Sequence, residues 1–224
     1  MIDPYADPAT GLLRNSRGIT DPDVLAAAEA DITAARIARL VEQPLPGVYD
    51  LAHLLDFHRE IFGSIYPWAG QVRTVNIAKE STTFCPAQNI EVFAADVFGR
   101  LARRDNFLRG LPLDGFLTKL ADLYGDINAL HPVREGSGRA QRAYLAQLAA
   151  DAGYRLEWTG MDPERNRLAS IASFNGHSGP LRALLADLTT ARASGERHAA
   201  SASAPVSQPA PVPAIRPGGP RPRS

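Results

Sequence analysis

The segment from His131 to Arg142 constrains the fold and chemistry of this chain more than any other. It reads His-Pro-Val-Arg-Glu-Gly-Ser-Gly-Arg-Ala-Gln-Arg. The preceding residues, 113–127, carry apolar side chains at helical spacing, and residues 139–152 form a second run compatible with a helix. A loop fixed between two helices is a rigid mount for functional groups. The pattern predicts a mainly helical domain with a catalytic or binding loop.

The glycine-flanked serine in this segment predicts an anion site. Amides at a helix start have no intrahelical acceptor, and the helix dipole adds positive potential there. Gly136, Ser137 and Gly138 would supply such amides. Arg139 and Arg142 would then fall in the first helical turn, where cations are disfavoured. Their presence indicates that a polyanion binds between them.

Two further side chains in the segment suggest chemistry on that anion. His131 is a proton acceptor near neutral pH, and Glu135 offers the hard oxygen that Mg²⁺ prefers. A base, a carboxylate, two arginines and an amide cradle together predict a reaction on a nucleoside triphosphate. The Gly-Ser-Gly run is not a P-loop, because no Gly-Lys-Ser/Thr follows it.

The segment resembles the signature of the Fic family, His-Pro-Phe-x-(Asp/Glu)-Gly-Asn-Gly-Arg-x-x-Arg. Other stretches resemble bacterial Fic domains in the same order, and the similarity covers roughly residues 5–189. These stretches are Tyr5-Ala-Asp-Pro-Ala-Thr-Gly-Leu-Leu-Arg-Asn, Gly18-Ile-Thr-Asp-Pro, Ile65-Tyr-Pro-Trp-Ala-Gly and Phe174-Asn-Gly.

The resemblance implies a Fic-type helical bundle with one short β-hairpin flap, over residues 1–190 including an N-terminal extension. It implies protein AMPylation, in which AMP passes from ATP to a hydroxyl of a target protein and pyrophosphate is released. ATP would be the substrate, Mg²⁺ the cofactor, and the flap would hold the target protein.

The resemblance also assigns roles within the segment and the flap. His131 would be the general base and Glu135 the Mg²⁺ ligand. The phosphates would be bound by Gly136, Ser137, Gly138, Arg139 and Arg142, and the target would dock on flap residues Ile77 and Lys79.

Two positions depart from the family signature, and they leave alternatives open. Val133 replaces phenylalanine, which predicts a loss of packing. Ser137 replaces asparagine, which tolerates left-handed backbone better than serine, so a weakened enzyme or a degenerate nucleotide- or partner-binding module is an alternative. A Doc-like kinase, which transfers the γ-phosphate of ATP, is the other alternative. Such kinases resemble Fic proteins but carry lysine where Gly138 stands, which argues against this alternative.

The rest of the chain yields a coarse map. Helices are expected from Pro22 to the prolines at 44 and 46, from Asp50 to Gly63, over 89–104, 163–175 and 180–189. Residues 71–86 are rich in β-branched side chains around a polar turn at 78–81, which predicts the hairpin. Residues 191–224 are rich in Ala, Pro, Ser and Arg, which predicts a disordered tail.

Composition excludes several classes of function. The formal net charge is zero, which gives no case for nucleic acid or an anionic membrane. Cys85 is the single cysteine, so no internal disulfide forms, and no apolar run is long enough for a membrane span. A cytoplasmic protein is expected.

The inhibitory Ser/Thr-x-x-x-Glu-Gly/Asn pattern of many Fic proteins is absent, which favours inhibition in trans by a small antitoxin-like protein.

Overall fold

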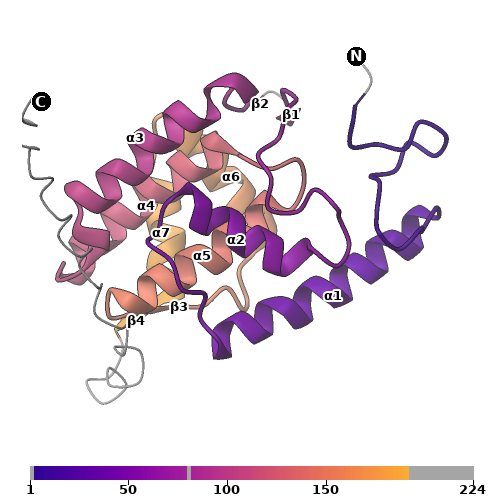
Figure 1. Ribbon diagram of the computed structural model, residues 1–224. Helices are drawn as coiled ribbons and strands as arrows, with labels where there is room; N and C mark the ends of the chain where they lie inside the picture. The colour runs from indigo at the N-terminus through magenta and orange to yellow at the C-terminus, as the bar shows by residue number, and fades with distance from the viewer. Residues whose placement is uncertain (1–2, 80–81, 192–224) are drawn as a thin grey trace, which may run out of the picture.

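The computed structural model describes residues 3–79 and 82–191, and this part of the chain is mainly helical (Figure 1). The expected helices are confirmed, with ends close to those predicted. They are α1 (Pro22–Glu42), α2 (Leu51–Phe62), α3 (Ile90–Arg103), α4 (Leu113–Leu130), α5 (Ser137–Asp151), α6 (Pro163–Phe174) and α7 (Gly179–Leu188), with short 3-10 turns η1 (Ala87–Asn89) and η2 (Asn106–Leu108).

Aspartates define the starts of three helices. Asp21, Asp50 and Asp162 each accept hydrogen bonds from amides of the following first turn. Proline follows Asp21 and Asp162 directly, at a position where its missing N–H costs nothing. These caps satisfy amides that would otherwise lack partners, which is why the sequence located these starts well.

The helix after the motif begins earlier than predicted. α5 starts at Ser137 because Gly136 takes a left-handed conformation (φ 77°) and its carbonyl accepts from the amides of Arg139 and Ala140, both at 3.1 Å. Arg139 therefore lies in the first turn, as predicted. The prediction that Arg142 also lies in the first turn is wrong, because Arg142 belongs to the second.

The hairpin is present but shorter than predicted. β1 (Ala78–Lys79) pairs antiparallel with β2 (Thr82–Thr83). The flanking residues instead bond to the motif region: Arg73 N–H donates to the Pro132 carbonyl at 2.9 Å and Cys85 N–H to the Ala129 carbonyl at 3.0 Å. The predicted turn at 78–81 is corrected in part, since Ala78 and Lys79 are strand residues.

The structure contains a second strand pair that was not predicted from the sequence. β3 (Tyr154–Leu156) pairs antiparallel with β4 (Thr189–Ala191), which joins the chain after α5 to the chain after α7. Each strand has only three residues, too few for an alternating pattern to be recognised. Ala191, one residue past the predicted boundary at residue 190, is part of β4. The expected disorder of the remaining tail lies outside the described residues.

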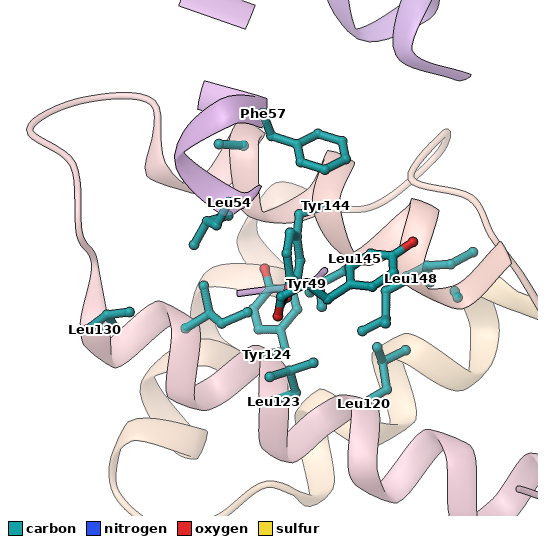
Figure 2. Close-up of a cluster of buried hydrophobic side chains, with 14 of the residues drawn as sticks. Tyr49, Leu54, Phe57, Leu120, Leu123, Tyr124, Leu130, Tyr144, Leu145 and Leu148 are labelled. Carbon is teal, nitrogen blue, oxygen red and sulfur yellow. Dashed lines mark hydrogen bonds between the residues drawn. The ribbon is translucent and has the colours of Figure 1, made fainter. Parts of the chain in front are cut away.

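The core holds α2, α4 and α5 together beneath the motif loop. Figure 2 shows Tyr144 of α5 among Tyr49, Phe57 and leucines of α4 and α5. Tyr144 is fully buried, and its hydroxyl donates to the Tyr49 carbonyl at 2.7 Å, so no polar atom is left unpaired. Within residues 3–79 and 82–191, no helix is long and apolar enough to cross a membrane.

This packing gives a stability prediction. Leu145 of α5 is fully buried, whereas Leu168 of α6 is 53% exposed. Leu145→Ala should lower the free energy of unfolding by about 2–5 kcal/mol, because it removes buried methyl groups and leaves a cavity. Leu168→Ala, the matched control, should stay within about 0.5 kcal/mol of the parent. Urea denaturation measures both, and equal losses would contradict this description of the core.

Candidate functional site

A cavity of about 1050 Å³ lies between the flap, the motif loop, the start of α5 and one face of α6. All nine residues predicted for the site line it. They are Ile77, Lys79, His131, Glu135, Gly136, Ser137, Gly138, Arg139 and Arg142. The structure therefore brings these residues together, and their individual roles stay predictions.

The amide cradle is built from two residues. As the first residues of α5, Ser137 and Gly138 have amides with no acceptor among the described residues. The Gly136 amide differs, because it donates to Glu135 Oε1 at 2.8 Å. Gly136 therefore contributes the bend with its amide engaged inside the chain, and its phosphate-binding role stays a prediction.

Glycine is required at position 136 for two reasons. Its φ of 77° disfavours any side chain, and a Cβ there would lie 2.2 Å from a ring carbon of Phe62. Ser137, in contrast, has a right-handed helical backbone and is 4% exposed. The concern that Ser137 must adopt left-handed geometry is therefore wrong, because Gly136 carries that conformation. Val133 is also buried, so the packing role of its position is retained.

The two arginines differ in how they are held. The Arg139 guanidinium contacts Glu29 Oε1 at 2.6 Å and Thr33 Oγ1 at 3.3 Å, and lies over the Phe62 ring at 4.7 Å. Arg142 forms no ion pair with another residue of the described part of the chain. One cation is thus fixed in place, and the other remains available to a ligand.

The Glu135 carboxylate is placed so that it could supply one ligand to a divalent cation. Its side chain is 43% exposed in the cavity, and only Oε1 is engaged, by the Gly136 amide and more distantly by Arg139 at 3.6 Å. No group of three or more His, Cys, Asp or Glu side chains among the described residues forms a complete metal site. Mg²⁺ commonly takes one protein carboxylate and completes its shell with phosphates and water, so the residues present fit Mg²⁺.

His131 is a buried, neutral imidazole. It ends α4 with left-handed backbone (φ 42°), and its ring stacks on Phe84 with 4.0 Å between centroids. Burial lowers its pKa to about 4, together with the nearby Arg73 cation and, to a smaller extent, Lys79, although the Asn128 carbonyl acts in the opposite direction. At neutral pH the ring is therefore unprotonated and can accept a proton.

Arg73 connects the flap to the motif loop. Its side chain is 2% exposed and donates to the carbonyls of His131 at 2.8 Å, Val75 at 2.6 Å and Cys85. Val75 and Cys85 lie on either side of the hairpin. A buried guanidinium is costly unless its donors are satisfied, so this arrangement fixes the flap ends relative to His131.

His58 of α2 supports the motif loop by hydrogen bonds. Its Nε2 donates to the Glu135 carbonyl at 2.9 Å, and its Nδ1 accepts from the Gly70 amide at 2.8 Å. Burial lowers the pKa of His58 to about 4, which keeps the neutral form that this bonding needs. Arg73 and His58 act through distant contacts, so no local pattern revealed them.

The flap and α6 form the other walls. Lys79 is exposed and Ile77 half-buried, and the β1–β2 sheet has two strands, so each strand presents an unpaired edge. On α6, apolar side chains of Ile171 and Phe174 line the cavity beside Asn166. Tyr124 Oη donates to Asn166 Oδ1 at 2.8 Å, which leaves the Asn166 amide N–H groups for a ligand. No pattern in the sequence predicted this surface.

Comparison with known proteins agrees with this geometry. The Fic/DOC family profile matches residues 48–149. Protein adenylyltransferase VbhT of Bartonella schoenbuchensis is 38% identical over 82% of the chain, which spans 38% of VbhT. The probable protein adenylyltransferase Fic of Salmonella typhimurium is 39% identical over 81% of the chain, which spans 90% of that relative.

A solved structure shows the same architecture. The N-terminal Fic domain of a VirB-translocated Bep effector protein from Bartonella quintana, with bound ADP, superposes with a TM-score of 0.80 at 26% identity. The match covers 84% of this chain and 95% of that domain. Together with the motif geometry, these similarities establish that the chain belongs to the Fic/DOC family.

Proposed function

We propose that the protein is an adenylyltransferase that moves AMP from ATP to a hydroxyl side chain of a target protein. The observation that carries the proposal is the meeting of two uncommitted amides, two arginines and a neutral buried histidine in one cavity. Relatives at 38–39% identity are named protein adenylyltransferases, and a structural neighbour holds ADP.

The chemistry follows from these groups. His131 takes the proton from the target hydroxyl, and the hydroxyl oxygen forms a bond to the α-phosphorus of ATP. The bond between that phosphorus and the bridging oxygen breaks, and pyrophosphate leaves with the electron pair. The amides of Ser137 and Gly138, with Arg139 and Arg142, stabilise the negative charge on the phosphates.

The cofactor of this proposal is Mg²⁺. Glu135 would hold it, and the ion, when bound, would supply further positive charge to the phosphates. The surface formed by Ile171, Phe174 and Asn166 would receive the nucleobase. The free edge of the flap at Ile77 and Lys79 would align an extended target segment by strand addition.

A Doc-like kinase is the second enzymatic candidate, and the residue at position 138 disfavours it, because such kinases carry lysine there and this chain has glycine. A Cβ at that position would lie 3.2 Å from Arg142 Nη1, the end of a flexible side chain that has to shift by only a few tenths of an ångström. A lysine there would bring a second cation against Arg142. The site as it stands favours transfer of AMP over transfer of the γ-phosphate.

Regulation in trans is part of the proposal. Arg142 has no carboxylate partner within the described residues, which supports an antitoxin-like protein that supplies one. Such a partner would block the γ-phosphate position. A cytoplasmic location is proposed with it, on the basis of the ATP requirement and the single cysteine.

Labelled ATP tests the proposed reaction directly. With α-labelled ATP, Mg²⁺ and cell lysate, the protein should label one or more proteins, because AMP retains the α-phosphate. His131→Ala should reduce labelling at least about a hundredfold, the usual scale for loss of a general base. Labelling from γ-labelled ATP instead would establish a kinase, and the absence of label from both nucleotides would refute enzymatic transfer.

The alternative of a degenerate binding module is tested at Ser137. Since the backbone there is helical, Ser137→Asn should be accommodated and should add an amide donor beside the phosphates. We expect a rise of about tenfold in labelling, the scale of one hydrogen bond to a charged group. Activity seen only in Ser137→Asn would support the degenerate module. A decrease on substitution would show that serine is the better residue here.

The influence of Arg73 on His131 is tested by proton NMR of the imidazole. Arg73→Met removes a cation that lowers the pKa of His131, so the pKa should rise from about 4 towards 6.5 while burial keeps it below that value. Arg73→Lys keeps the charge and should leave the pKa low. An unchanged pKa in folded Arg73→Met would contradict the electrostatic role.

A further inference from the structure

The Arg139 guanidinium lies between two carboxylates. Its Nη2 is 2.6 Å from Glu29 Oε1 and 3.6 Å from Glu135 Oε1. Glu29 comes from α1, which lies outside the residues that the family profile matches. Figure 1 shows α1 running along the edge of the bundle. Its contact with Arg139 is therefore a contribution to the site from outside the matched segment.

Glu29 is held more firmly than Glu135. The Glu29 side chain is 15% exposed against 43% for Glu135, and the Tyr66 hydroxyl donates to Glu29 Oε2. Thr33, one turn further along α1, contacts Nη1 of the same guanidinium at 3.3 Å. Arg139 is thus bound on its α1 side by two residues, and Glu29 itself is absent from the cavity lining.

We propose that Glu29 is a positioning residue that holds Arg139 away from Glu135, so that Glu135 stays available to the divalent cation. Arg139 and Mg²⁺ would compete for the carboxylate of Glu135, because both are cations that bind carboxylate oxygens. Without the negative charge of Glu29, the guanidinium moves onto Glu135, its nearest remaining counter-ion. Mg²⁺ then has to displace an arginine. The inference rests on the proposed nucleotide site and deepens it.

Glu29→Gln tests the inference with little structural change, because glutamine keeps an oxygen and nearly the same shape. Calorimetric binding of a non-hydrolysable ATP analogue is measured over a range of Mg²⁺ concentrations. We expect the half-saturating Mg²⁺ concentration to rise roughly tenfold, the scale of a charge-assisted contact. Tyr66→Phe, which removes only the bond to Glu29, should shift it in the same direction by less.

Two controls separate this role from a merely structural one. Asp31→Asn makes the same charge change on an exposed position of α1 and should leave the Mg²⁺ requirement unchanged. Glu29→Gln added to Arg139→Met should have no further effect, because no guanidinium remains to move. Additive effects in the double variant would overturn the inference.

The remaining outcomes are also decisive. An unchanged or lower Mg²⁺ requirement in Glu29→Gln would refute the inference while leaving the proposed function intact. Nucleotide binding without AMP transfer by the parent protein would refute the proposed function, and the Mg²⁺ shift would still be measurable. A parent protein that binds no nucleotide would refute both.

Discussion

The proposed nucleotide site depends on two unpaired amides at the start of α5, those of Ser137 and Gly138. A helix must leave its first N–H groups without internal partners, and burial of such groups is costly. Here Ser137 and Gly138 direct them into a cavity, while the rest of α5 is anchored by fully buried residues such as Tyr144 and Leu145. The core thus holds the start of α5 in place at the wall of the cavity, where we propose that the phosphates bind.

The motif loop that precedes α5 is polar and irregular, and hydrogen bonds from buried side chains fix its conformation. Arg73 binds the His131 carbonyl and both ends of the flap, and His58 binds the Glu135 carbonyl. His131 itself has a strained left-handed backbone, which persists only where its surroundings fix it. The positions of His131, Glu135 and the flap relative to one another are therefore set by a few buried hydrogen bonds.

The sequence predicted what is local and periodic. Helix starts at Asp21, Asp50 and Asp162 follow from capping, and α4 follows from its apolar spacing. The motif located the cavity through its residue types. Contacts between distant segments could not be predicted: Glu29 reaches Arg139 across 110 residues. The sequence suggested a left-handed backbone at Ser137, whereas Gly136 has it, because the sequence does not show which residue of a bend takes that conformation.

The most direct test of this account is a crystal structure of the protein with Mg²⁺ and a non-hydrolysable ATP analogue. The account predicts phosphate oxygens within hydrogen-bonding distance of the Ser137 and Gly138 amides, with the Arg139 and Arg142 guanidiniums against the β- and γ-phosphates. A nucleotide bound elsewhere, with both amides still without a ligand, would contradict it.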